Sequence, residues 1–283
     1  MTPPEVSLSM VVPAFNEAAR IAAPLREMAA WLAKRPERCE LIVVDDGSRD
    51  DTAALVVGVA ADLPVDVRVL SYSPNRGKGY ALKVGFAAAR GERILFSDCD
   101  LSTPLEEGER LLRALDEHEI AIGSRKAPGS QIEVHQAAYR EWMGKVFTAL
   151  VRRAIADVTD ATCGFKAFRG DVGRDLFSRL RVYDWSFDAE LLLIARRREL
   201  SLVELPVRWS DQAGTKVNVM RDALRALEGL LRIRWNDWLG RYDLPHPLDG
   251  EIRLLHPSDS PTLANEGDDS SARSQIREPS LAR

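Results

Sequence analysis

Short apolar runs alternate with amphipathic stretches over the first 123 residues, and this alternation constrains the fold more than any other feature. The runs predict strands at residues 8–12, 40–44, 67–71, 93–97 and 120–123. Apolar residues three or four apart predict helices at residues 18–33, 51–60, 79–89 and 105–117. Buried strands separated by helices are typical of a parallel sheet with crossover helices. The predicted fold class is therefore α/β.

After Gly123 the pattern changes to a strand, a loop and three helices. These are predicted at residues 202–209, 160–165, 139–156, 186–197 and 217–239. We predict one domain over residues 1–242, with a nucleotide-binding half at about 8–123 and an acceptor- and membrane-facing half at about 124–242.

The segment 243–283 is polar and poor in aromatic side chains. Such a composition predicts a largely disordered tail. The alternative is a small folded cap that uses Ile252, Leu254 and Leu255.

Composition excludes several classes of protein. The 283-residue chain has a net charge of only -4, which gives no overall signature of nucleic-acid binding. Its three cysteines predict no disulfide framework and fit a reducing compartment. No segment resembles a signal peptide, and no apolar run approaches the ~20 residues that span a bilayer. We expect a cytoplasmic protein that is soluble or attached to a membrane surface.

Two aspartates, Asp98 and Asp100, follow the apolar run at residues 93–97. If that run is a buried strand, both carboxylates lie beyond its carboxyl end and can share one divalent cation with a diphosphate. The pair alone also fits an ordinary loop, because Asp, Ser and Thr favour turns. Three more polar loops follow predicted strands and should meet this pair at one edge of the sheet. They are Pro13-Ala14-Phe15-Asn16-Glu17, Asp45-Asp46-Gly47-Ser48 and Asn75-Arg76-Gly77-Lys78-Gly79.

Two of these loops have both a structural and a functional interpretation. The loop at residues 45–48 suits a tight turn with a helix cap, or an acid that accepts hydrogen bonds from a nucleobase or ribose. The loop with Gly77 and Lys78 suits a phosphate at a helix start. It lacks the spacing of a P-loop, and no Gly-x-Gly-x-x-Gly follows a strand, which disfavours a dinucleotide-binding oxidoreductase.

Eight motifs in order resemble those of the family 2 glycosyltransferases, and most of all those of the dolichyl-phosphate β-glucosyltransferase branch. They are VVPAFNE, VVDDGSRDDT, NRGKGYALKVGF, SDCDLSTP, AIGSRK, TCGFKAF, WSFDAELL and PVRWSDQAGTK. The resemblance covers about residues 9–235. It implies a GT-A fold, a nucleotide-diphosphate sugar donor, Mg²⁺ or Mn²⁺, and inversion at the anomeric carbon.

The resemblance also implies roles in the donor site. Pro13, Phe15 and Glu17 would line the nucleotide pocket. Asp46 would contact the base, and Lys78 would lie near the nucleotide.

A metal site is implied next to these residues. Asp98 would lie toward the ribose and the metal, and Asp100 would ligate the cation that bridges the diphosphate. Ser102 stands where the related mannose synthases have a glutamine as a further metal ligand. A hydroxyl is a weaker ligand, so water would complete the shell.

Three cations resemble an acceptor-phosphate clamp. Arg125 and Arg140 match arginines of the mannose synthases, and arginine suits phosphate because its planar fork binds two oxygens. A further arginine of the mannose synthases has no counterpart here, and Lys216 is the available cation. This departure favours the glucosyltransferase branch and leaves the donor open.

Asp188 has two interpretations that depend on the acceptor. With a hydroxyl acceptor it is the best candidate for the general base. With an acceptor phosphate, which is ionised at neutral pH, it would orient basic groups or the acceptor. An aspartate at a helix start is also favoured by the helix dipole alone.

The helices predicted at residues 139–156 and 217–239 are basic and amphipathic and carry tryptophans. Such helices suit the headgroup layer of an anionic membrane. Their apolar stripes equally suit packing on the sheet, and both interpretations stay open.

The sequence thus predicts a metal-dependent inverting glycosyltransferase that moves a hexose, in the first place glucose, from a UDP-sugar to a polyprenyl or dolichyl phosphate. One alternative is a related enzyme with a soluble or hydroxyl acceptor. The other is a catalytically silent nucleotide-sugar-binding protein.

Overall fold

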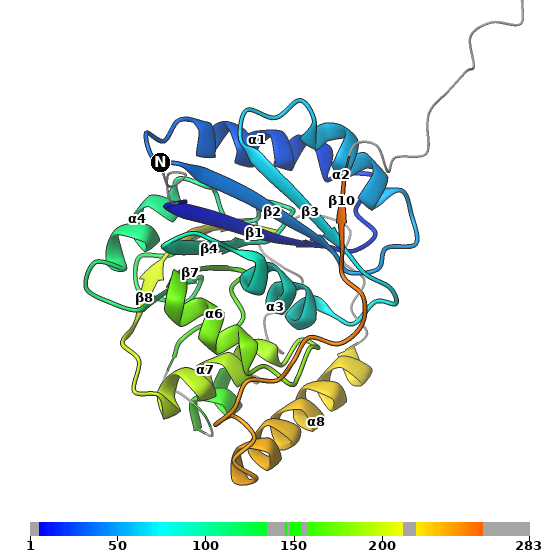
Figure 1. Cartoon of the computed structure of the whole chain (residues 1–283). Helices are drawn as coiled ribbons and strands as arrows, with labels where there is room; N and C mark the ends of the chain where they lie inside the picture. Colours follow the sequence, from blue (N-terminus) through cyan, green and yellow to red (C-terminus); the bar gives the residue numbers. More distant parts are fainter. Residues whose placement is uncertain are drawn as a thin grey trace, which may run out of the picture.

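The computed structural model describes residues 6–134, 145, 148–153, 155, 158–211 and 219–256, with the backbone alone for 219–227. Eight strands form one sheet with helices on both faces (Figure 1). They are β1 (Leu8–Ala14), β2 (Cys39–Asp45), β3 (Asp66–Ser71), β4 (Arg93–Ser97), β5 (Ile120–Ser124), β7 (Phe165–Arg169), β8 (Leu202–Pro206) and β10 (Arg253–Leu255). The helices are α1 (Ala22–Ala33), α2 (Thr52–Ala60), α3 (Lys78–Ala88), α4 (Glu107–Ala114), α6 (Gly170–Ser178), α7 (Phe187–Arg197) and α8 (Val219–Trp238). A separate small sheet consists of β6 (Gln131–Val134) and β9 (Arg208–Ser210).

The large sheet has the strand order β10-β3-β2-β1-β4-β7-β5-β8, and the predicted α/β class is confirmed. β1 pairs in parallel with β2 and β4, and β2 pairs in parallel with β3. Every residue of β1 and β2 is buried, as expected for strands covered by helices on both faces. Because parallel strands end at one edge, the loops that follow β1 to β4 meet there.

The first helix begins later than predicted. It starts at Ala22 rather than at residue 18, because the preceding backbone is bound to the loop after β2. The N–H of Asn16 donates to Ser48 Oγ (2.9 Å), and the N–H of Glu17 donates to Thr52 Oγ1 (2.8 Å). These side-chain acceptors replace the first helical turn.

β7 runs antiparallel to both of its neighbours, β4 and β5. Its amino end therefore lies at the edge where β4 has its carboxyl end. The N–H of Asp98 accordingly donates to the carbonyl of Gly164, just before β7, at 3.1 Å. The loop predicted at residues 160–165 is thus brought to the aspartate pair.

The strand predicted at residues 202–209 is divided into β8 and β9. Val207 lies between them, where its N–H donates to the carbonyl of Ser124 (3.1 Å) and its carbonyl accepts from Gln131 (3.2 Å). The chain therefore passes from the large sheet to the small one at this residue.

Apolar side chains form two cores, one on each face of the large sheet. α3, α6, α7 and α8 pack on one face, and α1, α2 and α4 pack on the other. Side chains of successive strand residues point to opposite faces of the sheet, so that in β1 Val11 belongs to one core and Val12 to the other. None of the helices in the described part of the chain is long and apolar enough to cross a membrane.

Residues 243–256 are folded, so the predicted disordered tail is wrong for this stretch. β10 pairs antiparallel with the edge strand β3. Before it, the N–H of Asp249 donates to the hydroxyl of Tyr80 (2.9 Å), and Leu248 and Ile252 pack on the core that contains Tyr80. An edge strand has unpaired backbone groups, and the few apolar residues of this stretch suffice to cover it. The alternative of a folded cap applies here, and residues 257–283 lie outside the described residues.

Glu190 in α7 makes the stability of this fold depend on pH. Its buried carboxylate accepts hydrogen bonds from the hydroxyl of Tyr242 (2.6 Å) and from the N–H groups of Arg181 (3.0 Å) and Val182 (2.8 Å). Burial is the largest influence and raises the pKa of Glu190 from 4.5 to about 7. The folded protein therefore holds this proton more tightly than the unfolded chain does. The stabilisation is complete below the unfolded pKa and is lost as the pH rises through the folded one.

We expect the free energy of unfolding to fall by about 2–3 kcal/mol between pH 5 and pH 8 on account of Glu190. Urea unfolding at both pH values should show this loss in the wild-type protein and a smaller one in Glu190→Gln. The same pH slope in both proteins would contradict the assignment.

Candidate active site

The polar loops predicted to share one edge of the sheet do so. Asn16, after β1, accepts a hydrogen bond at Oδ1 from the N–H of Arg49, after β2 (2.8 Å). Pro13 is buried in β1, whereas the Phe15 side chain beside it is 40% exposed. Glu17 forms an ion pair with Arg20. The nucleotide contacts predicted for Pro13, Phe15 and Glu17 stay predictions.

Asp46 has a structural role that differs from its predicted contact with a base. Its buried Oδ1 accepts from the hydroxyl of Tyr72 (2.7 Å) and the N–H of Arg76 (2.8 Å). Its Oδ2 accepts from Asn75 Nδ2 (2.7 Å) and the N–H of Gly77 (2.9 Å). Both oxygens are thus occupied by the loop before α3. Asp46 thus fixes that loop, and its predicted contact with a base stays a prediction.

The loop before α3 requires glycine at position 77. Gly77 has a φ of 101°, and a Cβ there would lie 2.5 Å from the carbonyl oxygen of Tyr183. The N–H of Gly79 donates to the same oxygen at 3.0 Å. This close approach brings the start of α3, and with it Lys78, to the aspartate pair.

Lys78 and Asp98 form an ion pair at the carboxyl end of β4, with 2.5 Å between Nζ and Oδ1. Burial opposes the charge on Lys78, but Asp98, together with Asp188 and Asp100, outweighs it and raises the pKa of Lys78. A Cβ at position 164 would lie 1.9 Å from Asp98 Oδ2, so glycine there makes room for this carboxylate. Lys78 and Asp98 are therefore brought together as predicted.

Asp100 and Ser102 lie beside this pair in the loop after β4. The N–H of Ser102 donates to Asp100 Oδ1 at 3.0 Å, and no described residue donates to Oδ2. Within the described ranges, no three His, Cys, Asp or Glu side chains could hold a metal by themselves. Mg²⁺ commonly takes one or two carboxylates, with substrate phosphates and waters as the other ligands. Asp98 and Asp100 fit that pattern, and the place of Ser102 in the shell stays a prediction.

Cys99 stands between the two aspartates and is buried. Burial, followed by the charges of Glu17, Asp98 and Asp100, raises the pKa of its thiol. A thiolate is disfavoured there, and this argues against Cys99 as a nucleophile.

Lys166 of β7 belongs to this site and was missed in the sequence. Its fully buried ammonium donates to Asp188 Oδ1 (2.7 Å) and to the carbonyl of Cys163 (2.6 Å). Burial raises the pKa of Asp188, although Lys166 and Lys78 lower it. The available signal was a lysine inside an apolar strand, because a buried lysine needs an anionic partner.

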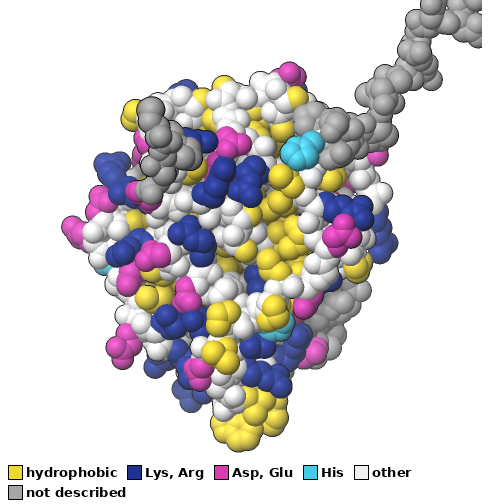
Figure 2. All heavy atoms as spheres, in the orientation of Figure 1, with side chains coloured by type: hydrophobic (Ala, Val, Ile, Leu, Met, Phe, Trp, Pro, Cys, Tyr) yellow, Lys and Arg dark blue, Asp and Glu magenta, His cyan; other side chains and the backbone are white. Residues whose placement is uncertain are grey.

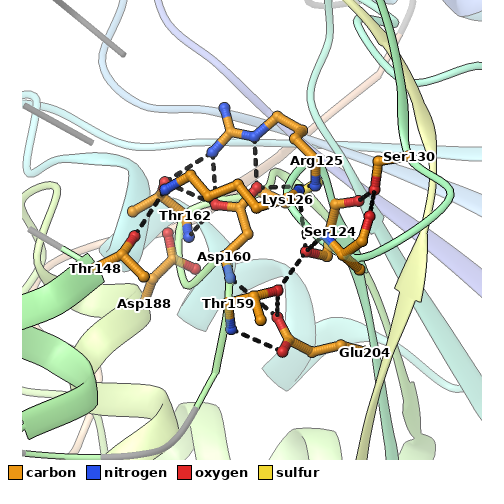
Figure 3. A network of polar contacts seen from close by, with 12 residues as sticks. Ser124, Arg125, Lys126, Ser130, Thr148, Thr159, Asp160, Thr162, Asp188 and Glu204 are labelled. Carbon is orange, nitrogen blue, oxygen red and sulfur yellow. Dashed lines mark hydrogen bonds and ion pairs between the residues drawn. The ribbon is translucent and has the colours of Figure 1, made fainter. Parts of the chain in front are cut away.

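Arg125, at the end of β5, is held by a network that the sequence did not predict (Figure 3). Its Nε and Nη2 donate to the two oxygens of the buried Asp160, at 2.6 and 2.8 Å. Burial opposes the charge on Asp160, but Arg125 outweighs it and lowers its pKa to about 2. Glu204 in turn accepts from the N–H groups of Thr159 (2.7 Å) and Asp160 (3.0 Å).

This network changes how Arg125 could bind a phosphate. Asp160 occupies the Nε and Nη2 edge of the guanidinium, and Nη2 also donates to Thr162 Oγ1 (2.9 Å). Among the described residues nothing accepts a hydrogen bond from Nη1. Within the described part of the chain, Arg125 therefore has only Nη1 left for a further acceptor, rather than an open fork. Arg140 and Lys216, the other cations of the predicted clamp, lie outside the described residues.

The fold is that of the nucleotide-diphospho-sugar transferases, the GT-A fold. It resembles glucosyl-3-phosphoglycerate synthase from Mycobacterium tuberculosis in complex with UDP, with a TM-score of 0.59, 20% identity, and coverage of 85% of this chain and 82% of that one. The same enzyme in complex with Mn²⁺ and UDP-glucose gives a TM-score of 0.57, with 21% identity over 85% of this chain and 80% of that one. The predicted GT-A fold is confirmed.

Residues 9–177 match the family described as glycosyl transferase family 2. Over 230 residues the chain is 36% identical to a dolichyl-phosphate β-glucosyltransferase of Trichomonas vaginalis, which covers 77% of this chain and 68% of the relative. Over 255 residues it is 33% identical to the dolichyl-phosphate β-glucosyltransferase of Homo sapiens, covering 85% and 79%. This chain belongs to glycosyl transferase family 2, and it is a glycosyltransferase.

Proposed function

We propose that this protein transfers glucose from UDP-glucose to a polyprenyl phosphate such as dolichyl phosphate, with inversion and with the help of a divalent metal ion. The observation that carries the proposal is the group of charges at the carboxyl edge of the sheet. Asp98, Asp100 and Lys78 lie together there and would hold a diphosphate, and Arg125 would bind a second anion. The names of the relatives, which are dolichyl-phosphate β-glucosyltransferases, support glucose as the sugar and dolichyl phosphate as the acceptor.

The donor side is proposed to work through charge. Asp98 and Asp100 would hold Mg²⁺ or Mn²⁺, which neutralises the charge that develops on the departing diphosphate. Lys78 adds a second cation, at the amino end of α3 where the helix dipole also favours an anion. Carboxylate and ammonium groups held in place in this way need no rearrangement as the leaving group departs.

The acceptor side is proposed to bind a phosphate rather than to activate a hydroxyl. A phosphate carries its negative charge at neutral pH and needs no base. Asp188, the candidate base, already forms a buried ion pair with Lys166. This pairing supports a positioning role for Asp188. The Nη1 of Arg125, which has no acceptor among the described residues, would donate to the acceptor phosphate, with Arg140 and Lys216 as further cations.

A lipid acceptor implies work at the surface of a membrane. We propose that the protein is peripheral, on the cytoplasmic face of an anionic membrane. Three free cysteines, Cys39, Cys99 and Cys163, support a reducing compartment.

The proposal can be tested with purified protein, a panel of UDP- and GDP-sugars, and a short water-soluble polyprenyl phosphate. With UDP-glucose we expect UDP and a prenyl glucosyl phosphate of the matching mass, and neither product after chelation of divalent metal. The corresponding prenyl alcohol is the control acceptor. Transfer to the alcohol would favour a hydroxyl acceptor, and donor binding without any product would favour a silent binding protein.

A further inference from the structure

Helix α8 has an apolar face on each side. Leu230 and Ile233 are buried in the core that α8 shares with α7. Leu231, Trp235 and Trp238 instead point outward, with 64, 58 and 74% of their surface exposed. Positions i, i+4 and i+7 lie on one face of a helix, so these three form a single stripe. Packing on the core is therefore confirmed for the inner face, and the membrane interpretation concerns the outer face.

The outer stripe is unusual for a surface in contact with water only. Figure 2 shows hydrophobic side chains gathered at the lower tip of the molecule, over the end of α8. The rings of Trp235 and Trp238 lie 5.1 Å apart. Tryptophans exposed side by side mark an interaction surface, and their ring geometry suits the boundary between apolar and polar layers.

Arginines border the stripe on both sides. Arg232 follows Leu231 by one position and Arg234 precedes Trp235 by one, which places them on opposite flanks of the outer face. Both arginine side chains are about half exposed. Arg232 pairs with Asp184 at a long 3.9 Å, and Arg234 pairs with Asp237 at 3.2 Å on the surface. Such pairs contribute little in water, so the guanidinium groups are available to other anions. Long basic side chains beside an apolar face reach the phosphates of a lipid surface.

The loop that precedes α7 packs on the inner, buried face of α8. Ser186 packs on α8 at Gly229, where a Cβ would lie 2.0 Å from its Oγ. The same loop carries Trp185, which is 68% exposed. It leads into α7, which begins at Phe187, next to Asp188. Tyr183, at its other end, accepts from Gly79 at the start of α3. One loop thus contacts both α8 and the start of α3, and its Asp184 pairs at 3.9 Å with Arg232 on the flank of the stripe.

We propose that the outer face of α8, formed by Leu231, Trp235 and Trp238 and flanked by Arg232 and Arg234, docks the enzyme on an anionic lipid bilayer. The exposed Trp185 extends this surface toward the site. A lipid acceptor then offers its phosphate to Arg125 while its chain remains in the bilayer. This inference rests on the proposed function, because it assumes a lipid-linked acceptor.

The test uses flotation with vesicles of phosphatidylcholine and phosphatidylglycerol in a 3:1 ratio, and with phosphatidylcholine alone. We expect the wild-type chain to float with the anionic vesicles and the double variant Trp235→Ala/Trp238→Ala to lose at least about tenfold in partitioning. Arg232→Gln/Arg234→Gln should weaken binding to the anionic vesicles only and reduce its salt dependence. Val134→Ala/Leu254→Ala removes exposed apolar side chains far from α8 in the chain and is the matched control. Far-UV circular dichroism and thermal denaturation check that each variant is folded.

Activity separates this inference from the proposed function. The tryptophan variant should keep its turnover on a short water-soluble polyprenyl phosphate and lose it on a long-chain acceptor embedded in anionic vesicles. Equal flotation of the wild type and the tryptophan variant would overturn the docking surface. A wild-type protein that is a dimer, with a tryptophan variant that is a monomer, would overturn it as well. If flotation depends on the tryptophans but the protein transfers sugar to no phosphate acceptor, the docking surface is supported and the proposed function is contradicted.

Discussion

Replacing Asp100 by Asn is expected to lower the rate of sugar transfer by about a hundredfold or more while leaving the fold intact. A metal ion at a departing phosphate is worth several kcal/mol, and each 1.4 kcal/mol corresponds to about a tenfold change in rate. Asp100 lies in a loop beyond β4, and its only hydrogen bond in the described structure is from the N–H of Ser102. Asparagine retains an oxygen for that bond, so the effect should be on the metal alone.

The measurement is the initial rate with UDP-glucose at increasing Mn²⁺, together with the binding of Mn²⁺ and UDP by calorimetry. Asp100→Asn should weaken Mn²⁺ binding in the presence of UDP. Ser102→Ala should change it little, because water can replace a hydroxyl ligand. Asp116→Asn, at an exposed ion pair with Arg93, is the control for loss of a carboxylate. Wild-type rates for Asp100→Asn at saturating Mn²⁺ would remove Asp100 from the site.

Replacing Lys166 by Met should destabilise the protein by about 3–5 kcal/mol, the usual cost of removing one partner of a buried ion pair. Lys166 is fully buried, and its partner Asp188 is nearly so. Methionine fills a similar volume but leaves the carboxylate of Asp188 without its ammonium. Since burial already raises the pKa of Asp188, loss of the cation should raise it further.

Urea unfolding at pH 7 measures this loss. The double variant Lys166→Met/Asp188→Asn should recover part of the stability, because no buried charge then remains unpaired. Lys34→Met, at an exposed position on the same chain, should unfold like the wild type. A Lys166→Met protein as stable as the wild type would mean that the pair is not needed by the fold.

Much of the site could be predicted because it depends on local sequence. Each of the strands β1 to β4 ends in a polar loop, and parallel strands bring such loops to one edge whatever else the chain does. Asp98, Asp100 and Lys78 were found in this way. The structural role of Asp46 was not predicted, because only the folded chain shows that Tyr72, Asn75 and Gly77 donate to its two oxygens.

The partners of the charged groups could not be predicted, since they come from distant parts of the chain. Asp160 and Arg125 are 35 residues apart, and Lys166 and Asp188 are 22 apart. Nothing in the local pattern at either position specifies the other. The antiparallel strand β7 decides both pairs, because it returns its amino end to the edge where β4 and β5 finish.

The sequence by itself determined the α/β class, the order of the first strands and helices, and the family of the enzyme, because periodicity and motifs are properties of contiguous residues. Only the tertiary structure decided that residues 243–256 close the edge of the sheet at β3, and that α8 buries Leu230 and Ile233 while it exposes Trp235 and Trp238. An apolar residue favours burial anywhere, and the packing of the whole chain determines which apolar residues find a partner and which remain at the surface.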